Sequence, residues 1–324
     1  MKDMDYIFAV ARIRVLEKTL LSDADISQMI ALKDEQAVLA FLSDKGWGES
    51  GGSAPSAEEI LACEEEKNRA LMREMKIDPK VFDILSYPQL FHNLKAAIKE
   101  ICTSETVPGI LYDLDRFGGK ELMEILREKE FGRLPEYMRK AASDAYEVML
   151  STRDGQRCDI IVDRACLEAM RGSAKKLKEP MVGSYVESQV AVADIRVAVR
   201  SVRTGKSLGF LKEALADCDA FTASELAQAA AKGEEALYTF LENRGFAEAV
   251  SAMKDSPSAF ERWCDNRLIE TIRPQKMNSV SLGPVVAYYL ARENEIKMAR
   301  ILLTAKANGF SEDSIRERVR EMYV

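Results

Sequence analysis

The chain has 324 residues, of which 47% are hydrophobic and 31% charged, with only 17 Gly and 9 Pro, so it excludes disordered and collagen-like classes and has room for two or three packed units. Its net charge is -7, whereas proteins that bind nucleic acid through the phosphates carry an excess of Lys and Arg. We therefore expect no nucleic-acid partner.

The sequence contains no segment that resembles a membrane span. Its longest apolar runs, such as residues 283–291, fall well short of the roughly 20 residues that cross a bilayer. The N-terminal MKDMDYIFAVARIR is interrupted by Arg12 and Arg14 and lacks a small-residue cleavage site, so it predicts neither a signal peptide nor an anchor. We expect a protein that is not inserted in a membrane and that stays where it is made.

Apolar residues recur at helical spacing along most of the chain, and clear strand alternation is absent from the sequence. Early helical segments lie within residues 22–42, and similar ones lie within residues 222–241. The stretch GWGESGGSAPS, residues 46–56, is predicted to be an exposed connection. The fold class expected is all-α.

Helix boundaries are marked by side chains that cap the backbone. In a capping box, a Ser or Thr hydroxyl and a Glu three residues later bond free backbone N–H groups at the helix start. This pattern predicts helix starts at Ser56 with Glu59, Thr222 with Glu225, and Ser258 with Glu261. Near the C-terminus, Asn308 and Gly309 predict the end of one helix before the last one begins.

Two segments about 200 residues apart resemble one another. SDADISQMIALKDEQAVLAFL, from Ser22, aligns with TASELAQAAAKGEEALYTFL, from Thr222, after one gap. A second recurrent element is an apolar residue followed by a cation, and it occurs as Ile13-Arg14, Leu94-Lys95, Ile195-Arg196 and Ile296-Lys297. The last three cations are each 101 residues apart.

These spacings predict three similar helical-bundle domains, at residues 1–107, 108–209 and 210–324. Solenoid repeats are shorter, about 20 to 45 residues, so we expect three bundles grouped about a pseudo-threefold axis with a central concavity.

Two interpretations of the recurrent cations Arg14, Lys95, Arg196 and Lys297 stay open. They pair with acids inside the protein, as Glu293 would with Lys297 four residues later, or they line the concavity and contact a partner.

The sequence offers few groups for catalysis. His92 is the only histidine, and neither a Gly-x-x-x-x-Gly-Lys-Ser/Thr loop nor a Gly-x-Gly-x-x-Gly motif occurs. The six cysteines are at least eight positions apart, which argues against Cys-x-x-Cys sites and indicates buried, reduced thiols. We expect no cofactor and no metal, and a packing or capping role for His92.

The best candidate for an acid–base or metal site is the group Asp154, Asp159 and Asp163. Asp159 and Asp163 share a face if their segment is helical. Such carboxylates more often begin a helix or pair with neighbouring cations, here Arg157 and Arg164. An all-α hydrolase built on this group is one alternative.

One stretch near the C-terminus reads GPVVAYYLARENEIKMARILLTAKANGFSEDSIRERVREMYV. It resembles the end of the C subunits of archaeal and bacterial V/A-type ATPases, a family related to the eukaryotic AC39 proteins. The opening YIFAVARIRVLEKTLLSDADISQMI and the internal YVESQVAVADIRVAVRSVR are similar to the same family, so the resemblance extends over the whole chain.

The resemblance implies an all-α funnel of three similar domains around a pseudo-threefold axis. It also implies a non-catalytic central-stalk protein at the cytoplasmic face of the membrane, which couples the D and F subunits of the rotor to the proteolipid ring and transmits torque for proton or sodium transport. The isolated chain is then expected to be soluble, monomeric and without ATPase activity. The other alternative is a free-standing helical adaptor that recruits partner helices.

Overall fold

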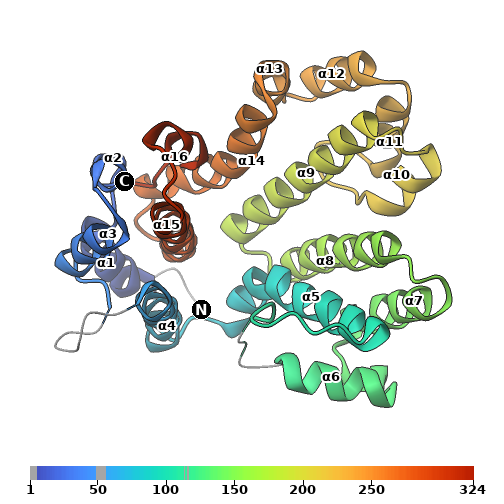
Figure 1. Cartoon of the computed structure of the whole chain (residues 1–324), viewed down its shortest axis with the longest axis horizontal. Coiled ribbons are helices and arrows are strands. Elements are labelled where there is room, and N and C mark those ends of the chain that lie inside the picture. Colours follow the sequence, from blue (N-terminus) through green and yellow to red (C-terminus); the bar gives the residue numbers. More distant parts are fainter. Residues whose placement is uncertain (1–5, 49–55, 113, 115–116) are drawn as a thin grey trace. The chain divides into compact units, whose positions relative to one another are not determined.

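The regular secondary structure of this protein is helical. The computed structural model describes residues 6–48, 56–112, 114 and 117–324, and every regular element in these ranges is a helix (Figure 1). The expectation of an all-α fold is therefore confirmed. Among these same residues, no helix combines the length and apolar character that a membrane span requires.

Contacts divide the chain into two compact units. Unit 1 comprises Met1–Ile77, Pro180–Tyr185 and Ala247–Val324, and unit 2 comprises Asp78–Glu179 and Val186–Phe246. Unit 1 joins segments that are far apart in the sequence, whereas the two segments of unit 2 are separated only by residues 180–185. The division into domains at residues 1–107, 108–209 and 210–324 stays a prediction.

Unit 1 is formed by the two ends of the chain. Its helices are α1 (Ile7–Leu16), α2 (Asp23–Ala31), α3 (Glu35–Asp44), α4 (Ala57–Glu74), α13 (Ala247–Asp255), α14 (Pro257–Ile272), α15 (Gly283–Ala307) and α16 (Glu312–Arg318), with short 3-10 turns at Glu17–Thr19 and Arg273–Met277. Helix α15 packs against α1, α3 and α4. The core joins Met29 and Leu42 from the N-terminal helices to Met298 and Leu302 of α15, so burial of apolar surface holds the two ends together.

Unit 2 holds the middle of the chain. Its helices are α5 (Pro79–Thr103), α6 (Gly119–Glu128), α7 (Glu136–Thr152), α8 (Gly155–Leu177), α10 (Leu208–Ala214), α11 (Ala223–Ala231), α12 (Glu234–Asn243) and the greater part of α9 (Pro180–Arg203), with a 3-10 turn at Phe131–Arg133. Helices α5, α7 and α8 pack on one another, as Figure 1 shows. Ile98, Leu122, Met138 and Val162 are fully buried there.

Three long helices carry the recurrent segments that end in a cation. Helices α5, α9 and α15 have 25, 24 and 25 residues. Each has a proline in its first turn, at Pro79, Pro180 or Pro284, where the fixed φ favours a helix and the missing N–H costs nothing. The repeat read from the sequence thus corresponds to a recurring type of helix.

The two segments that resemble one another also fold alike. Helices α2 and α11 each have 9 residues, and α3 and α12 each have 10. Both pairs open on a capping box, formed by Ser22 with Asp25 in one and by Thr222 with Glu225 in the other. The local repeat is confirmed at this level.

The second helix of each pair ends in the same way. Gly46 and Gly245 have φ of 86° and 85°, a left-handed conformation that Gly adopts without steric cost. The following N–H groups, of Trp47 and Phe246, then bond back into the last turn at 3.0 and 2.9 Å. Both aromatic side chains are buried, at 4% and 8% exposed.

Two of the predicted helix boundaries are confirmed and one is wrong. Ser56 and Thr222 cap α4 and α11 as expected. The third cap is Ser256, whose hydroxyl accepts the N–H of Ala259 at 3.0 Å, and not Ser258. Pro257 explains the difference of two residues, because it occupies the first helical position and the cap is then the residue before it, Ser256.

Two other local predictions can be compared with the structure. Helix α15 ends before Asn308 and Gly309, and Gly309 has a φ of 66°, so the predicted helix end is confirmed. The predicted exposed connection at residues 46–56 is wrong for Trp47 and Gly48, which are buried. Residues 49–55 of that connection lie outside the described residues.

The neighbouring serines at the start of α14 provide a matched test of the corrected cap. We expect Ser256→Ala to lower the free energy of unfolding by about 1 kcal/mol, because an orphan N–H of the first turn loses its acceptor. Ser258→Ala, at an exposed position, is expected to change it by less than about 0.5 kcal/mol. Urea unfolding of the two variants measures both values, and equal losses would contradict this assignment.

Candidate functional site

Among the four predicted cations, Arg14 and Lys95 have close partners within their own units. In unit 1, the guanidinium of Arg14 bonds Glu17 at 2.7 Å and also donates to the backbone carbonyl of Gln275 at 2.7 Å. In unit 2, the Lys95 ammonium on α5 bonds Asp163 on α8 at 2.8 Å. Both cations are half-buried, and their contacts tie separate segments together.

The other two cations differ in exposure. Arg196 is half-buried on α9. Lys297 is exposed on α15, with 53% of its side chain accessible, and its ammonium lies 3.4 Å from Asp265 on α14. The acid beside Lys297 is Asp265, and Glu293, which the sequence offered as an example of an internal partner, accepts a hydrogen bond from Asn68 on α4. Whether any of the four contacts a partner stays a prediction.

The three aspartates that carried the hydrolase alternative are engaged in the structure. Asp154 caps α8 by accepting the N–H of Arg157 at 2.9 Å. Asp159 and Asp163 pair with Lys99 and Lys95 of α5 at 2.6 and 2.8 Å. The lysine partners of Asp159 and Asp163 differ from the neighbouring arginines suggested by the sequence. They give these two carboxylates a role in joining α8 to α5.

His92 and the cysteines are also part of the packing. Nε2 of His92 lies 2.9 Å from the carbonyl oxygen of Ile110, and its ring packs edge-on against Tyr112. All six cysteines are free thiols. Burial raises the pKa of Cys158 to about 11 and that of Cys166 to about 12, so both stay protonated at neutral pH. Within the described ranges, no three His, Cys, Asp or Glu side chains gather as a metal site would require.

A buried polar side chain precedes the recurrent apolar–cation pair in each long helix. Asn93 on α5, Asp194 on α9 and Glu295 on α15 are each 0% exposed and are 101 residues apart. Each accepts a backbone N–H from a connecting segment. They were not identified from the sequence, although the signal was present: a polar residue stands at the same repeat position in all three copies.

The buried Glu295 belongs to a cluster of charges in unit 1. Arg292, on the same helix, bonds Glu295 and also Glu64 of α4. The side chains of Arg292, Glu64 and Glu295 are 11%, 2% and 0% exposed. The ring of Trp47 lies 4.5 Å from the guanidinium, which adds a cation–π contact.

Further bonds complete this cluster. Glu64 accepts the N–H of Gly48 at 2.8 Å and the ammonium of Lys67 at 2.7 Å, while Glu295 accepts the N–H of Leu21. Two cations therefore meet two carboxylates, and the formal charge balances. Helices α4 and α15, the segment before α2 and the segment after α3 are joined at one place.

The cluster keeps its arginine charged. Burial by itself lowers the pKa of Arg292, but the nearby Glu295 and Glu64 outweigh that effect, so the pKa of Arg292 is raised from its usual value. Burial raises the pKa of Glu295, and the Arg292 charge and the Leu21 N–H oppose that rise.

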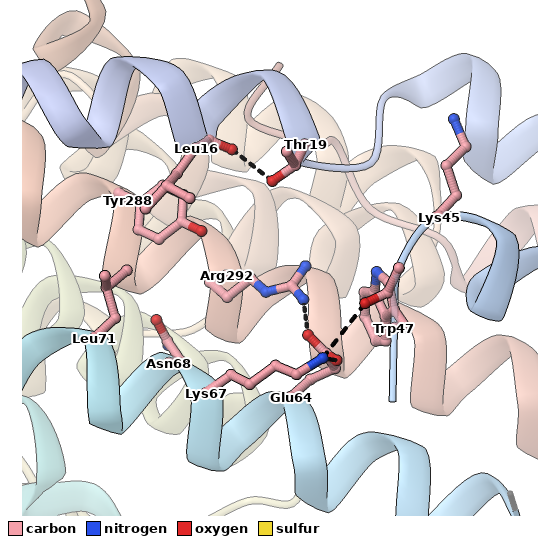
Figure 2. A pocket seen from close by; sticks show the side chains of 11 residues that line it. Leu16, Thr19, Lys45, Trp47, Glu64, Lys67, Asn68, Leu71, Tyr288 and Arg292 are labelled. Carbon is pink, nitrogen blue, oxygen red and sulfur yellow. Dashed lines mark hydrogen bonds and ion pairs between the residues drawn. The ribbon is translucent and has the colours of Figure 1, made fainter. Parts of the chain in front are cut away.

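A cavity of about 380 Å³ opens beside this cluster, and Figure 2 shows the side chains that line it. Arg292 reaches from α15 toward Glu64, while Lys67 and Asn68 come from α4 and Tyr288 from α15. In its wall, Lys67 and Arg292 bond Glu64, whereas Lys45 pairs with Asp25 outside the wall, and burial raises the pKa of Tyr288 to about 12. The bond between Arg292 and Glu64 holds α15 to α4. The cations in the wall are each paired with a carboxylate, and the Tyr288 hydroxyl stays protonated at neutral pH.

The charge cluster makes a measurable prediction for stability. Arg292→Met leaves Glu295 buried without a cation and leaves Glu64 with Lys67 alone, and we expect it to lower the free energy of unfolding by about 3–5 kcal/mol. Trp47 and Trp263 both lie in unit 1, so tryptophan fluorescence during urea unfolding reports this unit.

A matched control is available on the same helix. Arg300 pairs with Glu65 at 2.7 Å, but its side chain is 53% exposed, and Arg300→Met is expected to cost at most about 1 kcal/mol. Similar losses for the two variants would show that the buried cluster is no more important than an exposed ion pair.

Comparison with known proteins covers nearly the whole chain. Residues 9–318 match the ATP synthase (C/AC39) subunit family. The chain is 23% identical to the C subunit of the V-type sodium ATPase of Enterococcus hirae, with 81% of each chain covered. It is 26% identical to the C subunit of the A-type ATP synthase of Haloquadratum walsbyi, with 96% of each covered. With the corresponding A-type ATP synthase protein of Methanocaldococcus jannaschii it shares 22% identity, over 96% of this chain and 85% of the relative. This protein belongs to the ATP synthase (C/AC39) subunit family.

Proposed function

We propose that this protein is the central-stalk component that couples the rotor shaft of a V/A-type rotary ATPase or ATP synthase to the membrane ring. It receives the shaft formed by the D and F subunits, rests on the proteolipid ring at the cytoplasmic face, and transmits torque between them. Nucleotide hydrolysis and ion transport are carried out by other subunits. The coupling ion is a proton or sodium.

The observation that carries this proposal is the family match over residues 9–318. It includes segments of both units. The all-helical fold and the recurrence of long helices α5, α9 and α15 fit the three-domain funnel that the sequence resemblance implies. In that funnel, the wide concave face would receive the tip of the D protein and the narrower face would meet polar loops of the ring.

The contacts inside unit 1 suit a part that carries mechanical load. A load that twists a protein pushes its helices past one another. Hydrophobic contacts resist this sliding weakly, because they are non-directional. The hydrogen bonds and ion pairs of Arg292, Glu64 and Glu295 are directional and buried, so they resist such sliding. This supports a role in transmission of torque.

Lys297 is the recurrent cation best suited to contact another subunit. It is exposed, and its neighbour Asp265 has a second, shorter bond to Arg320 at 2.8 Å. The ammonium is thus available to a carboxylate or carbonyl oxygen of the shaft at little cost to the fold of this chain.

The first experiment identifies the partners. A tagged form of the chain, purified from membranes after mild detergent extraction, is expected to bring down the D and F subunits and the proteolipid. Mass spectrometry of the eluate is the measurement. Repeated recovery of the chain with a soluble partner and without ATPase subunits would favour an adaptor and overturn the proposal.

The second experiment tests coupling. Lys297→Glu is expected to weaken attachment of the soluble motor to the membrane sector, so that ATP hydrolysis continues but is uncoupled from ion movement. Lys232→Glu, at an exposed position in unit 2, is the control and is expected to leave coupling unchanged.

Hydrolysis by the released motor and ATP-driven ion uptake by membranes measure the two effects. Circular dichroism of the purified variants checks that both fold. If Lys297→Glu abolished hydrolysis while the chain stayed bound to the ring, this protein would act in the chemistry itself, and the coupling role would have to be abandoned.

A further inference from the structure

Asp194 is a buried carboxyl group with one hydrogen-bond donor. It lies on α9, is 0% exposed, and accepts the N–H of Ala216 with its two oxygens at 3.1 and 3.3 Å. Among the residues that the structure describes, no Lys or Arg forms an ion pair or hydrogen bond with it. A buried carboxylate without such a partner is costly in its charged form.

The residues at the equivalent positions of the other two long helices avoid the cost of an unpaired buried charge in other ways. Asn93 is an uncharged amide, which donates to the carbonyl of Tyr112 and accepts its N–H, both at 2.8 Å. Glu295 is a carboxyl group like Asp194, but it has Arg292 beside it. Asp194 therefore has an ionisable carboxyl group, as Glu295 does, but it lacks the paired cation that accompanies Glu295.

The charged groups that face Asp194 come from two places. Arg164 and Glu168 lie on α8, and Asp217 lies in the segment that carries Ala216. Arg164 is engaged elsewhere, with Glu168 at 2.8 Å and with the carbonyl of Lys212 at 3.0 Å. Burial raises the pKa of Asp194 to about 8, while the Ala216 N–H and Arg164 oppose the rise and the two acids add to it.

We propose that Asp194 is a proton-dependent contact, which in its neutral form holds residues 215–221 against α9 and in its ionised form releases them. This segment includes the buried Leu215, Cys218 and Phe221 and leads directly to Thr222, which caps α11. Ionisation brings water to Asp194 and loosens the start of the α11–α12 pair. Alkaline pH therefore weakens one defined part of unit 2.

The direction of the pH effect follows from proton linkage. The unfolded chain releases this proton near the ordinary pKa of an Asp, about 3.9, whereas the folded chain keeps it up to about pH 8. The stabilisation is complete below the lower value and is lost progressively as the pH rises to the higher one. Asp194→Asn removes this dependence, because the amide has no proton to release in that range.

The test compares the melting temperature of the full chain with that of Asp194→Asn from pH 5 to pH 8. We expect the variant's melting temperature, relative to the wild type, to rise by about 4 °C or more over this range. Asp144→Asn, at an exposed position on α7, is the control and is expected to show a constant difference. Parallel pH profiles for Asp194→Asn and the wild type would overturn the proposal.

A second measurement is made on the wild-type protein, so its result does not depend on whether a variant folds. In wild-type protein with ¹³C-labelled Asp carboxyl groups, one resonance is expected to keep its protonated shift at pH 6.5, where exposed carboxyl groups have titrated. It should be missing from Asp194→Asn if that variant folds. Titration of every Asp resonance below pH 5 in the wild type would overturn the proposal by itself.

Discussion

A fully buried polar side chain needs a partner inside the protein, because an unsatisfied one costs about 1–3 kcal/mol. Asn93, Asp194 and Glu295 place such a group at the same repeat position of α5, α9 and α15. Each satisfies it with a backbone N–H from a connecting segment, and the segments lead to α6, α11 and α2. One constraint thus ties the segment before a shorter helix to each of the three long helices.

The chemistry at this position differs from one long helix to the next. The amide of Asn93 keeps the same charge at every pH, whereas Glu295 has a charge balanced by Arg292. Asp194 has an ionisable group and no cation bound to it in the described structure. A repeat that keeps one geometry can therefore give each copy its own response to pH.

Much of the fold follows from local sequence signals. Apolar spacing and caps such as Thr222 act within one or two turns, so the helical class and the repeated helix pair were predicted correctly. The pattern of Ser258 with Glu261 predicts the start of α14 too late, because Pro257 occupies the first helical position and makes Ser256 the cap. The cluster of Arg292 and Glu64 was missed, since partners 228 residues apart leave no local pattern.

The same distinction separates the two kinds of charge on α15. Arg292 meets its carboxylates in a buried place, where salt screens the interaction little, whereas Arg300 and Lys297 face solvent, where screening is strong. The inner charges therefore keep helices in register under ionic conditions that weaken the outer ones. Under the proposed role, this arrangement lets contacts with other subunits form and break at the surface while the fold that carries the load stays intact. Because Arg292 keeps its buried partners, the fold stays intact while Lys297 and Arg300 exchange partners at the surface.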